Sequence, residues 1–385
     1  MTRTIIAGVG LLGGTTITDM GVVAGFLREQ MGVEVRFIPE LDPRRKLEWL
    51  KNECIDIFYE SSPTPMYLEG NSPEDIGPYR GPFPMRIVGS AHFAAIALVV
   101  REDSEINSIY DITPETRWAT PALVPNILLH GMLAWVRQYK SPIPENPARI
   151  EWTAKVIPCQ DTQASLRAVI EGRADITIAD AVEPWVRAAS KIRFLDLPVA
   201  SDPEGVGRFR RFVPIGKLKP APRETAEGIW GNTCFLGTAC LWCRPDFDTE
   251  LAYELTRWFD VNYALYKDKG MKLLSYTRQA FREALDVATA PVHNGTVRYC
   301  RETGIWTKAD DARQEYNTRL MDWYCAVWKE ATAEAKARGI AISAASEPWI
   351  KLWAGRKKEL HIPVYRQMND GEIEQGLTLL KGLGR

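Results

Sequence analysis

The sequence predicts an α/β protein of two lobes with a helical extension at its C-terminal end. A chain of 385 residues is too long for one small core. Apolar residues make up 45% and charged residues 25%, which is the composition of a folded globular protein. Short apolar runs alternate with segments of helical periodicity, as they do in parallel sheets covered by helices.

The first lobe begins as strand, helix, strand, helix and strand. Apolar spacing predicts strands over 2–9, 33–38 and 55–59, a helix that ends at Gly32, and a helix over 43–52. A glycine-rich turn follows the first strand. A stretch rich in Pro and Gly, residues 71–84, predicts a surface loop. This order of elements indicates a parallel sheet.

A continuously apolar run over 93–100 is long enough for a strand that crosses into the second lobe. There the pattern predicts strands at 117–120, 156–157 and 175–179, and helices near 126–139 and over 162–171. Residues 201–224 are polar and predict loops, and a strand over 235–242 returns the chain. The predicted lobes are therefore 1–92 with 238–306, and 93–237. Two crossing antiparallel strands would form a hinge between them.

The remaining residues, 307–385, predict a helical extension that packs on the first lobe or on a partner subunit. Thr307 and Asp310 can cap a helix that ends near Gly339. The apolar stripe of this helix favours a core or a dimer face over a cofactor site; it consists of Leu320, Trp323, Tyr324, Val327 and Trp328. A homodimer is therefore one interpretation of the extension.

Charge and composition exclude some classes of partner. A formal net charge of −1 provides no basic footprint for nucleic acid, and no apolar run of about 18 residues predicts a transmembrane helix. The first residues lack the apolar run of a secretory signal. The seven cysteines are scattered and odd in number, which is typical of a reducing compartment. We therefore expect a cytoplasmic chain as it stands, or a periplasmic one if a signal has been removed.

Cys240 and Cys243 have the spacing of a redox or zinc pair. They lie in a segment that reads as a strand, where residues three apart point to opposite faces. We therefore favour a structural role for both cysteines over a redox or zinc site. The four histidines share no metal-ligand spacing either, and we expect no metal and no cofactor.

Four stretches carry a resemblance to a known family. They are Gly13-Gly14-Thr15, residues 98–112 (LVVREDSEINSIYDI), residues 166–175 (LRAVIEGRAD) and residues 291–304 (PVHNGTVRYCRETG). The first, second and fourth stretches are similar, in order and interval, to the solute-binding proteins of the TAXI branch of TRAP transporters. The third is similar to an element found in the second lobe of binding proteins more generally. Together the four stretches cover about residues 1–306. The resemblance implies a type II periplasmic-binding-protein fold that closes a cleft around one small organic ligand.

Two expected ligand loops depart from the family pattern. Residues 41–46 (LDPRRK) and 120–126 (TPALVPN) stand where the family usually has small residues such as Gly and Ser. The extension beyond about residue 307 also exceeds the usual family ending. The resemblance therefore implies the fold but not the identity of the ligand.

The glycine-rich turn allows three interpretations. Gly8, Gly10 and Gly13 meet the dinucleotide fingerprint, with Glu40 near the end of the next strand. A ligand carboxylate could instead meet the helix N-terminus at Gly14, Thr15 and Thr16, because its N–H groups attract anions. The turn could also hold nothing. We favour the carboxylate.

Further candidates follow predicted strands, where open α/β sheets bind ligands. In the first lobe Arg45 or Lys46 could pair with a carboxylate, although a solvated charge run is an alternative. The other candidate ligand contacts are Glu60, Ser61 and Ser62 in the first lobe, and Asp180, Glu183, Trp185, Trp230 and Asn232 in the second. His92 begins the crossing strand, where it could meet a ligand or donate a proton.

Two functions from different classes fit these residues. The first is binding of a small organic carboxylate, with aromatic acids included, by a receptor whose partners are membrane transporter subunits only if the protein is exported. The alternative is a cytoplasmic, cofactor-free decarboxylase or lyase acting on an aromatic carboxylic acid. In that enzyme His92 or Glu183 would act as the acid, and Arg45 or Lys46 would hold the carboxylate.

Overall fold

The computed structural model describes residues 3–10, 15–61, 64–121, 127–139, 152–214, 216–270 and 272–384. The chain forms two compact units. Unit 1 consists of Met1–His92, Ala239–Gly270 and Tyr276–Arg385, and unit 2 of Phe93–Thr238 and Met271–Ser275. Two long strands, β4 (Arg86–Arg101) and β10 (Thr233–Cys243), contribute residues to both units. Each unit combines strands and helices, which confirms the predicted α/β class.

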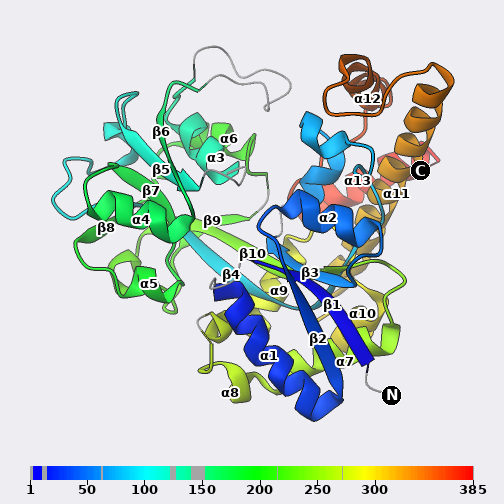
Figure 1. The fold of residues 1–385 in the computed structure, drawn as a ribbon, viewed down its shortest axis with the longest axis horizontal. Coiled ribbons are helices and arrows are strands. Elements are labelled where there is room, and N and C mark those ends of the chain that lie inside the picture. Colours follow the sequence, from blue (N-terminus) through cyan, green and yellow to red (C-terminus); the bar gives the residue numbers. More distant parts are fainter. Residues whose placement is uncertain are drawn as a thin grey trace. The chain divides into compact units, whose positions relative to one another are not determined.

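The sheet of unit 1 has the strand order β2-β1-β3-β10 (Figure 1). Strands β1 (Arg3–Val9), β2 (Val33–Pro39) and β3 (Ile57–Ser61) are parallel, and β10 is antiparallel to β3. Helices α1 (Thr15–Met31) and α2 (Pro43–Lys51) connect the strands. Gly32 follows α1 with φ +64°, a conformation that glycine adopts without steric cost and that ends the helix where the sequence predicts.

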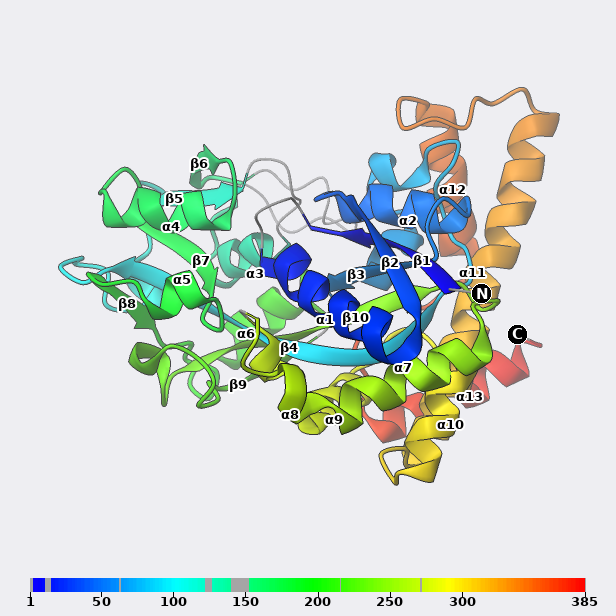
Figure 2. The same cartoon turned by 60° about the horizontal axis from the view of Figure 1, so that its bottom comes forward.

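Side chains of the unit 1 sheet alternate between two apolar layers. Ile57 and Tyr59 face an apolar space shared with α1 and with α7 (Thr249–Val261). Phe58, between them in sequence, is fully buried in a different cluster, with residues of α2 and the C-terminal helices. This period of two places a helix layer on each face of the strands (Figure 2).

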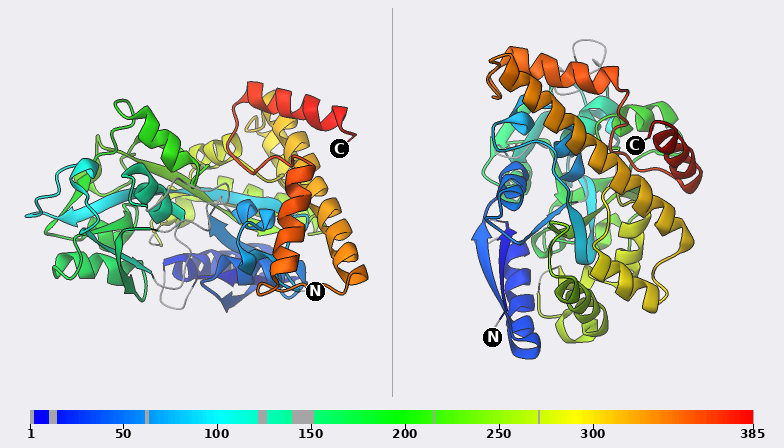
Figure 3. Two further views of the ribbon diagram at one scale, coloured as in Figure 1. Left: turned by 90° about the horizontal axis from the view of Figure 1, so that it is seen from above. Right: turned by 90° about the vertical axis from the view of Figure 1, so that its right-hand side faces the viewer.

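The C-terminal part of unit 1 is helical. It comprises α8 (Tyr263–Tyr266), α9 (Arg278–Asp286), α10 (Asn294–Glu302), α11 (Lys308–Ala337), α12 (Glu347–Glu359) and α13 (Asp370–Gly382). Thr307 and Asp310 form a capping box at the start of α11, and the apolar stripe of this helix is buried in the unit 1 core. Figure 3 shows α12 and α13 against α11. The stripe is therefore core within unit 1.

The sheet of unit 2 has the strand order β4-β7-β5-β6. It contains β5 (Arg117–Pro121), β6 (Lys155–Cys159) and β7 (Ile176–Asp180), with β8 (Ile192–Leu195) paired to β4 and β9 (Lys217–Pro220) paired to β10. Its helices are α3 (Ile127–Trp135), α4 (Thr162–Ile170), α5 (Pro184–Arg187) and α6 (Pro203–Arg210).

Both units also contain short 3₁₀ turns. Those of unit 1 are η1 (Thr64–Glu69) and η2 (Pro73–Ile76), and those of unit 2 are η3 (Ile109–Asp111), η5 (Glu227–Ile229) and η6 (Leu273–Ser275).

The prediction of loops over 201–224 is wrong, because α6 and β9 lie there. Asp202 caps α6 by accepting a hydrogen bond from the Gly205 N–H at 2.7 Å. Phe209, on the same helix, is fully buried in the unit 2 core. The helix is thus held by its cap and by one buried aromatic ring, although it contains two glycines and three charged residues.

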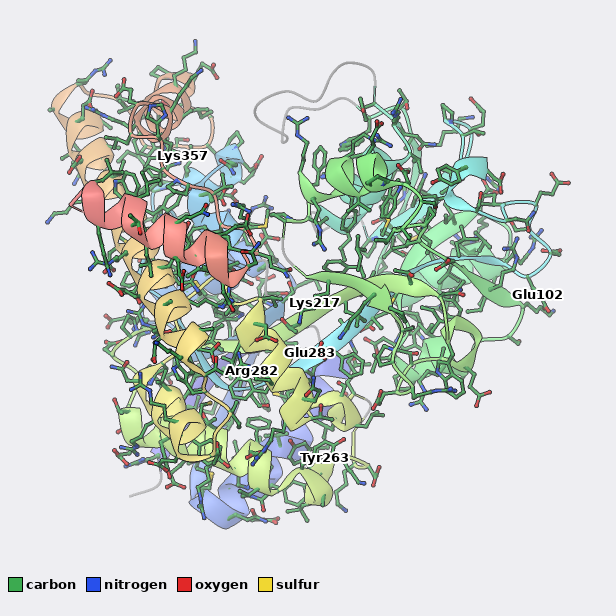
Figure 4. All side chains as sticks on the ribbon, turned by 180° about the vertical axis from the view of Figure 1, so that it is seen from behind. Glu102, Lys217, Tyr263, Arg282, Glu283 and Lys357 are labelled. Atoms are coloured by element: carbon green, nitrogen blue, oxygen red, sulfur yellow. The ribbon has the colours of Figure 1, made fainter. Side chains whose placement is uncertain are left out.

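The C-terminal extension is attached to the 3₁₀ turns of unit 1 through backbone oxygens. The indole nitrogens of Trp349 and Trp353 donate to the carbonyl oxygens of Ile76 and Glu69 at 2.8 and 2.9 Å. Lys357, labelled in Figure 4, donates to the same Glu69 carbonyl at 2.7 Å. The Glu69 carboxylate in turn accepts from the Tyr365 N–H at 2.6 Å. These contacts fix α12 and the segment after it on η1.

This attachment predicts a pH dependence of stability. Burial raises the pKa of Glu69 to about 7 from 4.5, and burial lowers the pKa of Lys357 to about 8 from 10.5. The folded protein therefore holds the Glu69 proton more tightly than the unfolded chain does. We expect the Glu69 contribution to the free energy of unfolding to fall as pH rises from about 4.5 to 7. We expect the Lys357 contribution to recover as pH rises from about 8 to 10.5.

The variant Glu69→Gln isolates the acidic part of this dependence, because glutamine does not titrate. From pH 5 to pH 7.5 we expect wild type to lose stability relative to the variant by on the order of 2 kcal/mol. Urea unfolding at both pH values measures the difference. A difference between the two proteins that does not change with pH would contradict the prediction.

Candidate functional site

The carboxyl ends of β1 and β3 meet at one edge of the unit 1 sheet. These strands are parallel neighbours, with Gly8 opposite Phe58. Thr16, in the first turn of α1, lies beside the end of β1, since a Cβ on Gly10 would be 3.6 Å from its Cβ. Polar side chains that follow parallel strands at such an edge are placed to contact ligands. We call Thr16, Lys46, Glu60 and Ser61 the strand-edge group of unit 1.

Lys46 is the charged centre of the strand-edge group, and only 3% of its side chain is exposed. Its ammonium donates to Glu60 Oε2 at 2.7 Å and to the Tyr59 carbonyl oxygen at 3.3 Å. Glu60 Oε1 accepts from the Ser61 N–H at 2.9 Å and from its hydroxyl at 3.1 Å. The carboxylate thus fixes the ammonium at the sheet edge. Two of the three ammonium protons are engaged by the part of the chain that the structure describes.

Three consecutive cations begin α2, and each has an acidic partner. Arg44 contacts Asp75 at 2.6 Å, Arg45 contacts Glu40 at 3.6 Å, and Lys46 contacts Glu60. These acids compensate for the unfavourable position of cations at a helix N-terminus. Of the pair Arg45 and Lys46, only Lys46 contacts Glu60, so only Lys46 is counted in the strand-edge group; the Arg45 side chain is 58% exposed and contacts Glu40.

Other predicted residues of unit 1 are placed as follows. Thr15 is the first residue of α1, while Gly13, Gly14 and Ser62 lie outside the described residues. Glu40, the acid of the dinucleotide fingerprint, accepts from the Asp42 N–H at 2.9 Å and contacts Arg45.

His92 lies within β4 and is 1% exposed. Its ring is stacked on Tyr59, with centroids 5.4 Å apart and planes 2° apart. On another side it contacts Tyr276 at a centroid distance of 4.9 Å. The imidazole is therefore part of a packed aromatic group of unit 1. The sequence places it at a strand start, whereas β4 begins six residues earlier, at Arg86.

A second charged group lies at the carboxyl end of β7 in unit 2. The Lys272 ammonium is 2.8 Å from Asp180 Oδ2 and 2.7 Å from Glu183 Oε1. Asp180 Oδ1 also accepts from the N–H groups of Ala95 and Val182. Burial would lower the pKa of Lys272, but Asp180 and Glu183 outweigh burial and raise it. The structure thus brings two predicted residues together around a lysine that the sequence does not indicate.

The position of Lys272 explains why sequence reasoning missed it. It lies about 90 residues after Asp180, in Met271–Ser275, which groups with unit 2 although the sequence assigns 238–306 to the first lobe. Its ion pairs with Asp180 and Glu183 lie within unit 2. The residues around a single lysine do not indicate a partner that is so distant in the chain.

The other predicted residues of unit 2 have contacts of their own in that unit. Trp185 is partly buried against the unit 2 core. Trp230 is 37% exposed, and the Arg223 guanidinium lies 4.6 Å above its ring. The Asn232 amide donates to the Phe194 carbonyl oxygen at 3.3 Å.

Cys240 and Cys243 both lie in β10 and are buried. Burial raises the pKa of Cys243, which keeps the thiol protonated and unreactive. Among the residues described, no group of three or more His, Cys, Asp or Glu is arranged to hold a metal. Within the same ranges, no helix has both the length and the apolar character needed to cross a membrane.

The Lys272 group predicts a strong stability effect. Replacing Lys272 by Met leaves two nearly buried carboxylates without their shared cation, so we expect the free energy of unfolding to fall by about 3–5 kcal/mol. The exposed neighbour Lys269 provides the control, because Lys269→Met should change it by less than about 0.5 kcal/mol. Thermal and urea unfolding measure both variants. Equal stability of the two would show that the buried ion pairs do not hold Met271–Ser275.

The solved structures to which this chain is similar include three at low sequence identity. No family model matches the chain, and no curated protein matches it. A putative periplasmic sulfonate-binding protein of an ABC transporter from Methylobacillus flagellatus is 14% identical, with a TM-score of 0.40, covering 94% of this chain and 95% of that one. An R. palustris protein solved with adipate is 14% identical, with a TM-score of 0.43, covering 67% and 83%.

A probable amino-acid ABC transporter extracellular-binding protein from Bacillus subtilis is also 14% identical, with a TM-score of 0.40, covering 71% of this chain and 97% of that one. At these identities and TM-scores the likenesses do not indicate a ligand or an activity for this chain.

Proposed function

We propose that this protein reversibly binds a small organic carboxylate at the strand-edge group of unit 1. The observation that carries the proposal is the buried Lys46 ammonium, which Glu60 fixes at the carboxyl edge of β1 and β3. A fixed cation with a remaining N–H donor is suited to a charge-assisted hydrogen bond with a carboxylate. The proposed ligand class includes aromatic acids.

Two neighbours of Lys46 support an anionic ligand. Thr16 lies in the first turn of α1, a helix of 17 residues whose N-terminus carries a partial positive charge. The side chain of Lys46 runs along β1, because a Cβ on Gly8 would be 3.4 Å from its Cγ. The aliphatic part of Lys46 therefore lies against β1, and its ammonium lies at the end of β3.

The biological role that we propose is that of a solute receptor, as the resemblance to the TAXI branch implies. If the protein is exported, it would deliver its ligand to membrane transporter subunits. If it remains in the cytoplasm, it would act as a ligand-binding protein there. In either location the proposed chemical event is binding and release of an unchanged acid.

The two residues that would act as the acid in the enzyme alternative are each engaged by other side chains. His92 is packed between two tyrosine rings, and Glu183 is ion-paired with Lys272. An ion-paired carboxylate accepts hydrogen bonds and is poorly suited to donate a proton. Turnover of the bound acid is nevertheless measured in the same experiment as binding.

The test is calorimetric titration with adipate, benzoate and 4-hydroxybenzoate. We expect saturable binding of at least one acid to wild type. Its affinity should be about tenfold or more weaker in Lys46→Met, because a hydrogen bond to a charged group contributes about 1.5–3 kcal/mol. Arg36→Met is the matched control, since Arg36 is a cation of the same unit with a 66% exposed side chain. That variant should bind as wild type does.

The variant Lys46→Met also leaves Glu60 without its cation, so the double variant Lys46→Met with Glu60→Gln is measured as well. The double variant should regain stability without regaining affinity. Equal affinity in wild type and in both Lys46 variants would refute the proposed site. Release of CO₂ or a changed ultraviolet spectrum of the acid would replace the receptor role with the decarboxylase or lyase alternative.

A further inference from the structure

An open groove lies in unit 1, between the C-terminal end of α11 and helix α12. Its open space is about 650 Å³, which is within the size range of binding pockets. The two helices lie side by side in the C-terminal extension (Figure 3). None of the residues that line the groove belongs to the strand-edge group, so the groove is a separate feature of the unit.

The charged residues of the groove are equal in number for the two signs. They are Glu334, Glu347, Glu359, Arg338, Lys351 and Arg356. Two of the cations share one acid, because Arg338 contacts Glu334 at 2.8 Å and Arg356 Nε donates to the same carboxylate at 3.2 Å. These contacts join α11 to α12. A lining that carries both signs equally suits a surface that also carries both, rather than a simple anion or cation.

The outward face of α12 carries a row of residues spaced four apart, which are Glu347, Lys351, Gly355 and Glu359. Residues with this spacing lie above one another on a helix. The three charged side chains of the row are between 55% and 74% exposed. Their ion pairs within the chain are long, at 3.6 Å from Lys351 to Glu347 and 3.5 Å from Glu359 to Arg356. Such exposed pairs contribute little to stability, so these charges can pair with a second surface at little cost.

Gly355 lies in the middle of this row. Among the residues that the structure describes, a Cβ at this position would meet no atom within 4 Å, so the single chain has room for a side chain there. Glycine inside a helix is less stable than alanine. Packing within the single chain therefore gives no reason for this glycine. A second backbone that approaches the helix closely at this point does give one.

The row is complementary in charge to itself about Gly355. Lys351 lies four residues before the glycine, and Glu359 lies four residues after it. Helices that pack through rows of this spacing cross at about −50°, which aligns the two rows. When two copies of α12 cross at Gly355 in opposite directions, Lys351 of each copy faces Glu359 of the other. A two-fold axis therefore produces the same charge contact twice.

We propose that this face of α12 is the interface of a symmetric homodimer, in which two copies of the helix cross in opposite directions at Gly355. Leu352, which is partly exposed in the groove, would be covered by the second copy. The contacts between copies would replace the long ion pairs within each chain. Because the row complements itself, its charges favour a second copy of this chain over a partner with an excess of one sign. The interface is independent of the ligand proposed for the strand-edge group.

The first measurement is sedimentation equilibrium of the full chain. A contact centred on one helix of 13 residues is smaller than a standard interface, so we expect a dissociation constant of about 10–100 µM. Between about 1 µM and about 1 mM, wild type should therefore change reversibly from monomer to dimer. A chain that remains monomeric over this range would overturn the proposal.

Charge reversal tests the register of the two helices. Lys351→Glu and Glu359→Lys should each raise the dissociation constant about tenfold or more, because each places like charges opposite one another. In an equal mixture these two variants should form a heterodimer, since every acid of the row then faces a cation. Lys329→Glu makes the same charge change at an exposed residue of α11 that does not line the groove, and it should dimerise as wild type does. A mixture that stays monomeric, or equal weakening by Lys329→Glu, would contradict the proposed interface.

Gly355→Gln separates the interface from the stability of the single chain. The dilute variant should have a higher Tm than wild type, because the position has room and glutamine forms helices better than glycine. The same side chain should block the close approach of the second helix, so the dimer should be lost at every concentration measured. A dimer that persists in Gly355→Gln would show that the copies meet through another surface and would overturn the proposal.

Discussion

A lysine ammonium that is almost removed from water is the charged centre of the candidate site at the sheet edge of unit 1. A buried charge is tolerated only where a partner of opposite charge and good geometry is present. Glu60 is that partner for Lys46. It lies at the end of β3, which is paired with β1 on one side and β10 on the other. The side chains that hold Lys46 therefore also define where an anionic ligand could approach.

The same requirement recurs in other parts of the molecule. In unit 2 the Lys272 ammonium joins a short segment to Asp180 and Glu183. In unit 1 the attachment of the C-terminal extension differs, because the Lys357 ammonium donates to the Glu69 carbonyl oxygen and the Glu69 carboxylate accepts from the Tyr365 N–H. Buried charges contribute modestly to net stability when paired, yet removing one partner is costly. They therefore specify which segments lie together more than they add to the overall stability.

Local signals in the sequence were sufficient for much of the fold. The capping pair Thr307 and Asp310 predicts the start of α11, and Gly32 predicts the end of α1. Such features depend on residues a few positions apart. Helix α6 was missed because its apolar contribution is confined to few residues, and a polar composition outweighed the cap at Asp202.

The candidate site was only partly predictable, because sequence signals are local and the site depends on contacts between distant segments. Lys46, Glu60 and Ser61 could be named because they follow strands that local patterns reveal. Their pairing, and the exclusion of Arg45, required the register of the strands and the direction of each side chain. The role of Lys272 depends on contacts with distant segments, which a single sequence does not encode in any local pattern.

The central claim is that a carboxylate ligand contacts the Lys46 ammonium. The most direct measurement is ¹H–¹⁵N NMR of the lysine ammonium groups, with the Lys46 signal assigned by its loss in Lys46→Met. During titration with whichever of adipate, benzoate or 4-hydroxybenzoate binds, the Lys46 signal should shift saturably, with the dissociation constant found by calorimetry. A saturable calorimetric signal with an unchanged Lys46 resonance would contradict the account.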